Sequence, residues 1–181
     1  MARDLEGKVI LLTGGTEGIG KAAALELARR GADLTIVGRN PEKTERVLGE
    51  LKAAGGEGGT VRMLLGDLSS MAEVRRVASE FKASRQRLDV LVNNAGAIFA
   101  HKHLTADGLE MTFALNHLGY FLLTRELFYT AVTRAKSRLR VVGGPEAVRT
   151  AIESPALRAS GLASRVATRR GQWEDQGRTS P

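Results

Sequence analysis

The sequence contains no cysteine, few aromatic residues and no run of 18 apolar residues. Without cysteine the chain can form neither disulfides nor thiolate metal sites, and this fits a reducing compartment, so we expect a cytoplasmic protein. The lack of a long apolar run predicts no membrane span, and the first six residues lack the apolar region of a secretory signal. Only His101, His103 and His117 could supply imidazole ligands, and we expect ordinary surface histidines there rather than a metal site.

The apolar residues that are present suffice for one folded domain, since they make up 43% of the 181 residues. The charge is placed unevenly. Residues 127–181 hold 10 Lys and Arg against 4 Asp and Glu, which supplies +6 of the formal net charge of +7. Such a segment can bind nucleic acid, but we favour a solvated end of the chain, with 167–181 disordered. The shift in composition predicts a boundary near residue 126, between a domain over 1–126 and a segment over 127–166.

Apolar runs alternate with helical patterns along the first two-thirds of the chain. This alternation predicts an α/β fold, a Rossmann-like doubly wound parallel sheet of four or five strands with helices on both faces. The strands are expected at 8–13, 34–37, 61–65 and 89–92. Helices are expected from the glycine turn to about Arg30, from Pro41 after the cap Asn40, from Ser69 or Ser70, and from about Leu109. The unbroken apolar run from Val9 to Leu12 is typical of a strand buried on both faces.

A glycine-rich turn between the first strand and its helix is the strongest motif. Gly14, Gly18 and Gly20 have the spacing G-x-x-x-G-x-G. A helix N-terminus offers free amides and a positive dipole end to a pyrophosphate, and glycines let the backbone approach it. The alternative is the phosphate loop of ATPases, because 15–21 reads G-x-x-x-x-G-K. Ala22 then stands where a hydroxyl should hold magnesium, so we favour the dinucleotide interpretation.

Four sequence motifs carry a family resemblance. Residues 13–20 (TGGTEGIG) and 93–96 (NNAG) resemble the signatures of the short-chain dehydrogenase/reductase family. Residues 66–68 (GDL) follow the third strand, where that family contacts adenine, and 116–124 (NHLGYFLLT) resemble its retinol-dehydrogenase-like branch. The resemblance covers 5 to about 125 and implies an oxidoreductase that binds a nicotinamide dinucleotide.

The resemblance also implies which residues hold the cofactor. They are Gly14, Thr16, Glu17, Gly18, Ile19, Gly20, Arg39, Asn40, Asp67, Leu68, Asn94, Ala95 and Gly96. Asp67 would accept a hydrogen bond from the adenine amine, although an aspartate here could also cap the next helix. The backbone of Asn94, Ala95 and Gly96 would pass beside a ribose.

The end of the second strand indicates which cofactor is preferred. NAD enzymes place an acid there for the ribose hydroxyls, whereas this chain has Arg39 and Asn40. Arg39 could pair with a 2′-phosphate and stack on adenine. Glu17 slightly favours NAD instead, because NADP enzymes often carry a basic residue near this position. We therefore predict NADP, with NAD as the second choice.

The catalytic part of the family pattern is incomplete. The resemblance gives Asn116 the role of holding a catalytic lysine through water. That lysine belongs to a Tyr-x-x-x-Lys pair, in which it lowers the tyrosine pKa. Here Tyr120 and Tyr129 are each followed four positions on by threonine, and the family's catalytic serine has no counterpart. We predict a truncated family member that binds NAD(P) without hydride transfer; an active reductase with another proton donor stays open.

The last third of the chain resembles a different family. Residues 127–170 are similar to the C-terminal end of the exonuclease V alpha subunit, a superfamily 1 helicase. By that resemblance Arg134 would touch an ATP γ-phosphate, but such a group needs a complete phosphate loop. A fusion product without enzymatic function, or a basic nucleic-acid-interacting module, is the alternative, although we expect no nucleic acid partner. Leu139 to Val142 could add a fifth strand; otherwise the unpaired sheet edge could support a homo-oligomer.

Overall fold

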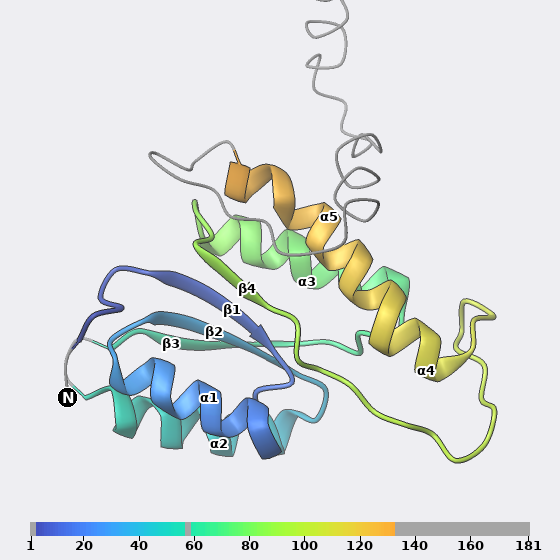
Figure 1. Ribbon diagram of the computed structural model, residues 1–181, viewed down its shortest axis with the longest axis horizontal. Helices are drawn as coiled ribbons and strands as arrows, with labels where there is room; N and C mark the ends of the chain where they lie inside the picture. Colours follow the sequence, from blue (N-terminus) through green and yellow to red (C-terminus); the bar gives the residue numbers. More distant parts are fainter. Residues whose placement is uncertain (1–2, 57–58, 133–181) are drawn as a thin grey trace, which may run out of the picture. The chain divides into compact units, whose positions relative to one another are not determined.

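The computed structural model describes residues 3–56 and 59–132, which contain one parallel sheet with helices on both faces (Figure 1). The strands are β1 (Val9–Thr13), β2 (Asp33–Gly38), β3 (Val61–Leu65) and β4 (Val90–Val92). Their order is β3-β2-β1-β4, and all neighbours are parallel. The connecting helices are α1 (Gly18–Arg29), α2 (Pro41–Gly55) and α3 (Met71–Ser84). The predicted Rossmann-like, doubly wound class is therefore confirmed.

Two apolar cores lie on opposite faces of the sheet. Helices α1 and α2 cover one face, and α3 covers the other together with α5 (Gly119–Val132) (Figure 1). Ile10 and Leu12 of β1 pack into the first core, while Leu11 between them packs into the second. All three are almost fully buried. The alternation of side chains along a strand thus explains why the run from Val9 to Leu12 has no polar residue.

The helices that follow β2 and β3 begin at side-chain caps. Asn40 Oδ1 accepts a hydrogen bond from the Lys43 amide at 2.8 Å, and Pro41 takes the first helical position of α2. Ser70, not Ser69, caps α3, and its Oγ accepts from the Glu73 amide at 3.5 Å. These caps satisfy amides that have no partner inside the helix, and they fix where each helix starts.

The segment after β4 contains a feature that the periodicity did not predict. The helix expected from about Leu109 begins as α4 (Met111–Phe113), where the Glu110 carboxylate accepts from the Thr112 and Phe113 amides at 2.9 and 2.8 Å. A π-helical turn, η1 (Ala114–Leu118), then joins α4 to α5. Such turns often mark functional positions in helices.

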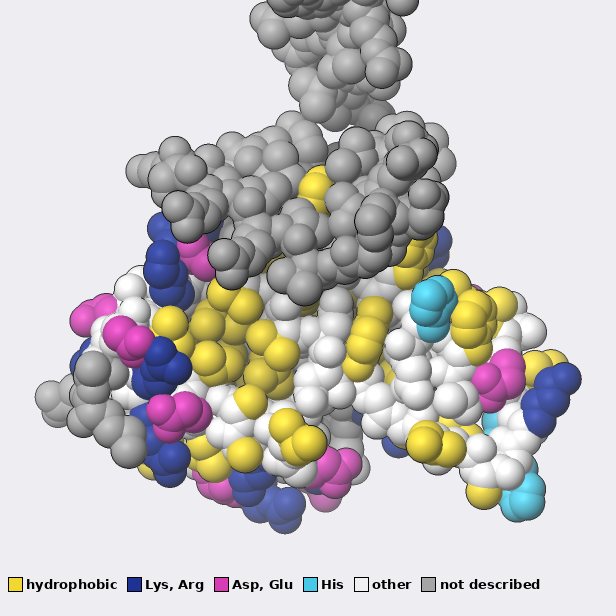
Figure 2. Space-filling model, in the orientation of Figure 1, with side chains coloured by type: hydrophobic (Ala, Val, Ile, Leu, Met, Phe, Trp, Pro, Cys, Tyr) yellow, Lys and Arg dark blue, Asp and Glu magenta, His cyan; other side chains and the backbone are white. Residues whose placement is uncertain are grey.

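The loop that precedes α4 is ordered by its own hydrogen bonds. Leu104 and Glu110 form an antiparallel bridge, and Asp107 Oδ2 accepts a hydrogen bond from the Met71 amide at 2.9 Å. The loop is thereby attached to the first turn of α3. His101 and His103 belong to this loop, and His117 belongs to η1. Figure 2 shows histidine side chains among apolar and charged side chains. No group of three potential metal ligands comes together among the residues described.

Strand β4 forms one edge of the described part of the sheet. It pairs with β1, and within residues 3–56 and 59–132 no strand pairs with its other side. Val90 is 42% exposed there. An oligomer contact at this edge stays a prediction. The expected fifth strand at 139–142 and the expected disorder of 167–181 lie outside the described residues.

Candidate functional site

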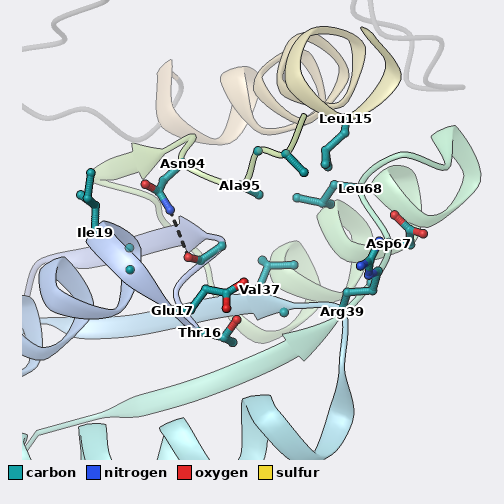
Figure 3. Close-up of a pocket in the computed structure, with 17 residues that line it drawn as sticks. Thr16, Glu17, Ile19, Val37, Arg39, Asp67, Leu68, Asn94, Ala95 and Leu115 are labelled. Carbon is teal, nitrogen blue, oxygen red and sulfur yellow. Dashed lines mark hydrogen bonds between the residues drawn. The ribbon is translucent and has the colours of Figure 1, made fainter. Parts of the chain in front are cut away.

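A cavity of about 500 Å³ opens at the carboxyl ends of the strands (Figure 3). The turn after β1, the ends of β2 and β3, the segment after β4 and one residue of η1 contribute to its wall. The lining residues are Gly14, Thr16, Glu17, Gly18, Ile19, Gly20, Val37, Gly38, Arg39, Gly66, Asp67, Leu68, Asn94, Ala95, Gly96, Ala97 and Leu115. Open parallel sheets bind ligands at this edge, near the point where the strand order reverses.

Two glycines of the first turn have no room for a side chain. A Cβ on Gly14 would lie 2.6 Å from Ala95 Cα, and one on Gly20 would lie 2.1 Å from the Gly14 carbonyl oxygen and 2.3 Å from Asn94 Nδ2. The glycine turn is thus in direct backbone contact with the segment after β4. Gly18 differs from both, because it has a φ of +53° and no atom within 4 Å of an added Cβ.

The N-terminus of α1 lies open at the cavity wall. Glu17 occupies the position before the helix, yet its side chain accepts no hydrogen bond from the amides of the first turn. Gly18, Ile19 and Gly20 of that turn all line the cavity. Uncapped amides and the positive end of the helix dipole therefore border the same space, which is the arrangement that attracts a phosphate.

A hydrogen-bond network joins the ends of β1 and β4. The hydroxyl of Thr13, which is fully buried, donates to the Val92 carbonyl at 3.3 Å and accepts from the amides of Asn94 and Ala95 at 2.9 and 3.0 Å. Asn94 Nδ2 donates to the carbonyl oxygens of Thr13 and Gly14 at 3.1 and 3.0 Å. Figure 3 shows the last of these bonds. The motifs at 13–20 and 93–96 are thus parts of one wall. Thr13, which sequence reasoning did not single out, links them.

Two side chains from η1 and α5 hold the segment after β4. Asn116 Oδ1 accepts from the Ala97 amide at 3.0 Å, and its Nδ2 donates to the Ala97 carbonyl at 2.9 Å. Tyr120 donates its hydroxyl hydrogen to the Ala95 carbonyl, and burial raises the pKa of Tyr120. Asn116, the predicted catalytic residue, does not line the cavity but lies against its wall near Gly96. The side-chain oxygen and nitrogen of Asn116 are therefore both hydrogen-bonded to the backbone of Ala97.

The end of β3 supplies a carboxylate to the cavity. Asp67 Oδ1 accepts from the amide and the hydroxyl of Ser69 at 3.0 and 2.7 Å, so the carboxylate is held in place. Its Oδ2 makes no hydrogen bond with the residues that the structure describes. Because Ser70 caps α3, the alternative that Asp67 itself caps this helix is wrong.

Three charged side chains lie near the end of β2. Arg39 is exposed, lines the cavity and has no ion-pair partner within the described part of the chain. Glu17 lines the cavity too, and its carboxylate pairs with the Lys43 ammonium of α2. That hydrogen bond lowers the pKa of Glu17. Asn40, predicted to bind the cofactor, is absent from the lining, because its side chain is used as the cap of α2.

Sequence reasoning missed five of the lining residues, namely Val37, Gly38, Gly66, Ala97 and Leu115. Gly38 ends β2 and Gly66 directly follows β3, and a Cβ there would lie 2.1 Å from Thr44 Oγ1 and 2.5 Å from Val77 Cγ2, respectively. A glycine at each strand end was the available signal. Leu115 had none, since its position depends on the π turn.

The comparisons with known proteins identify the family of this fold. The family model described as short chain dehydrogenase matches residues 8–164. The chain belongs to the short-chain dehydrogenase family. Human retinol dehydrogenase 11 is 43% identical over 136 residues, which cover 75% of this chain and 42% of that protein.

Two solved structures resemble this short-chain dehydrogenase family member. The Pseudomonas aeruginosa RhlG/NADP active-site complex has a TM-score of 0.60 and 34% identity, over 70% of this chain and 48% of that one. A metagenomic short-chain oxidoreductase in complex with NADP has a TM-score of 0.61 and 32% identity, over 70% of this chain and 57% of that one. The chain spans less than two thirds of each of these proteins.

The family match also extends beyond the expected boundary near residue 126. It runs to residue 164 and so includes most of 127–170, the segment expected to resemble a helicase tail. The helicase resemblance stays a prediction. Among the described residues, no helix is both long enough and apolar enough to cross a membrane.

Proposed function

We propose that this short-chain dehydrogenase family member binds a nicotinamide dinucleotide, NADP in preference to NAD, in the cavity at the strand ends. The observation that carries the proposal is the uncapped N-terminus of α1, which opens on this cavity at Gly18. Gly14 and Gly20 have no space for a Cβ, whereas Gly18 faces open space that a pyrophosphate can enter. The same wall would reject a side chain and accept a phosphate.

The other predicted residues fit the remaining parts of the cofactor. Asp67 has a carboxylate oxygen to spare for the adenine amine, and Arg39 is available for a 2′-phosphate. The segment from Asn94 to Gly96 presents small side chains and backbone where a ribose would pass. The complexes of RhlG and of the metagenomic oxidoreductase with NADP support this choice of cofactor.

We further propose that the 181-residue chain does not complete hydride transfer. A bound nicotinamide would supply the hydride, but the carbonyl oxygen also needs a proton. No tyrosine of this sequence is followed four positions on by lysine. Tyr120, which lies beside the cavity wall, donates to the Ala95 carbonyl and has a raised pKa, so it is a poor proton donor for a substrate.

A fluorescence titration tests the binding proposal. Purified protein is titrated into NADPH, and separately into NADH, while the nicotinamide emission is recorded. We expect a saturable change with both cofactors and a lower Kd for NADPH. A linear response with both would contradict the proposal.

The proposed lack of turnover needs a separate assay. NADPH oxidation is followed at saturating cofactor with a panel of aldehydes and ketones. We expect no oxidation above the rate without protein. Steady oxidation that depends on both the protein and a carbonyl compound would overturn this part alone and leave cofactor binding intact.

A further inference from the structure

One wall of the cavity carries a negative charge where the preferred cofactor would also be negative. Glu17 lines the cavity, and its side chain is 76% exposed. Figure 3 shows Glu17, Thr16 and Arg39 on the same side of the cavity, opposite Ala95 and Leu115. A 2′-phosphate that reaches Arg39 therefore approaches the Glu17 carboxylate, which would repel it.

Lys43 offsets this charge from the first turn of α2. There its amide donates to Asn40 Oδ1 at 2.8 Å. Asn40 directly follows Arg39 in the chain. The Lys43 ammonium pairs with the Glu17 carboxylate and lowers the pKa of that group, so the carboxylate is ionised at neutral pH. Arg39, Lys43 and Glu17 together carry a formal charge of +1. Without Lys43 the group would be neutral.

We propose that Lys43 is a specificity residue for the 2′-phosphate, because it neutralises the Glu17 carboxylate that lines the cavity. The inference rests on the proposed binding of NADP and NAD in this cavity. NAD lacks the phosphate, so its affinity should depend little on either charge. Lys43, the third residue of α2, thus offsets the negative charge of Glu17.

A purely structural role for this ion pair makes a different prediction. The Glu17–Lys43 pair also joins the turn before α1 to α2, and an exposed pair of this kind adds little to stability. In that case removal of Lys43 would affect NADPH and NADH equally, through a small change in the turn. The two roles are separated by comparing the two cofactors.

The chain offers a matched control for this comparison. Lys21 of α1 pairs with Glu50 of α2, with 2.7 Å between Nζ and Oε2, so it links the same two helices. Neither lysine lines the cavity, but the partner of Lys43, Glu17, does, whereas the partner of Lys21, Glu50, does not. Lys21→Gln therefore removes an equivalent surface pair without changing the charge beside the phosphate.

The experiment measures the Kd of NADPH and of NADH for the wild type, Lys43→Gln, Glu17→Gln, the double variant and Lys21→Gln. We expect Lys43→Gln to weaken NADPH about tenfold, because the unpaired Glu17 carboxylate then repels the 2′-phosphate, and NADH less than about twofold. Glu17→Gln should strengthen NADPH a few-fold. The double variant restores the formal charge of +1 and should lie close to the wild type. High salt should reduce these differences for NADPH.

Three results would overturn the inference while NADPH and NADH still bind. They are an equal loss for both cofactors in Lys43→Gln, weaker NADPH binding in Glu17→Gln, and a loss in Lys21→Gln as large as that in Lys43→Gln. Thermal unfolding of the free variants shows whether each is folded. If the folded wild type binds neither cofactor, the proposed function itself is wrong, and this inference is wrong with it.

Discussion

Gly20 is the residue at which the glycine turn is packed most tightly. An alanine there would place its Cβ 2.1 Å from the Gly14 carbonyl oxygen and 2.3 Å from Asn94 Nδ2. Neither the backbone carbonyl nor the anchored amide can move without shifting the cavity wall. We expect Gly20→Ala to lower the free energy of unfolding by about 1–3 kcal/mol and to abolish saturable NADPH binding. Urea unfolding and NADPH fluorescence measure the two effects.

Gly49 provides the matched control for this substitution. It is an exposed residue inside α2, and an added Cβ meets no atom within 4 Å. Gly49→Ala should raise the free energy of unfolding by about 0.5–1 kcal/mol, because alanine is the better helix former, and should leave NADPH binding unchanged. If Gly20→Ala behaved in the same way, the turn would not be packed as described.

Single residues also show how far the sequence could predict the site. Gly14, Gly18 and Gly20 were predictable because their spacing between a strand and a helix is a local motif, although the contacts that crowd Gly14 and Gly20 include Ala95 and Asn94, which lie far away in the sequence. Asn40 and Asn116 were harder, since an amide side chain can meet a cofactor, a catalytic group or a backbone amide. Which partner it meets depends on segments distant in sequence, such as Ala97 for Asn116.

At the scale of elements, the connection into β4 depends on one carboxylate. Asp89 Oδ2 accepts from the Val9 amide and from Arg87 Nε, both at 2.8 Å. Burial raises the pKa of Asp89, but the hydrogen bonds from Arg87 and Val9 outweigh it, so the net pKa lies below its ordinary value. A lowered folded-state pKa means that Asp89 stabilises the fold above the unfolded pKa near 3.8, and less as pH falls through the folded value.

This sign predicts how an Asp89→Asn variant depends on pH. At pH 7 we expect the free energy of unfolding to fall by about 1–2 kcal/mol, since a charge-assisted contact is lost. Below the unfolded pKa the difference from the wild type should shrink, because the wild-type carboxyl is then protonated as well. Chemical unfolding at several pH values checks this. A difference that stayed constant down to pH 2.5 would contradict the proposed titration of Asp89.

The hydroxyl of Tyr120 couples α5 to the cavity wall. It donates to the carbonyl of Ala95, a residue that lines the cavity. Tyr120→Phe should lower the free energy of unfolding by about 1 kcal/mol and weaken NADPH and NADH by a similar few-fold factor, because the wall loses one of its ties. Leu122→Ala, which removes core packing from the same helix, is the comparison. If Leu122→Ala raised the Kd of both cofactors as much as Tyr120→Phe does, relative to the stability each variant loses, the hydroxyl would have no specific role.

Elements were predictable where the pattern of apolar residues is local. β1 follows from an apolar run and β3 from an apolar run interrupted by Arg62. Helices α2 and α3 follow from their caps and helical periodicity. The π turn at Ala114–Leu118 was not predictable from the same pattern. It inserts one extra residue into a helical turn, and the apolar positions on either side still resemble a continuous helix.

At the scale of the whole molecule, the cavity connects all four strand ends. Its wall includes residues from Gly14 to Leu115, so a bound dinucleotide would touch segments that are joined through both cores. The order β3-β2-β1-β4 places the carboxyl ends of adjacent strands together, which is why motifs far apart in sequence meet. The alternation of strands and helices predicted the parallel sheet, and open parallel sheets bind ligands at this edge.

This arrangement predicts that the cofactor stabilises the described domain as a unit. A ligand that binds only the folded state adds about 2.7 kcal/mol at 100 times its Kd. For a chain of this size that corresponds to a rise in Tm of roughly 5–10 °C. Thermal unfolding with NADPH should show this shift, and Gly20→Ala should show none. If NADPH at saturating concentration left the wild-type Tm unchanged, it would not bind the folded cavity in preference to the unfolded chain.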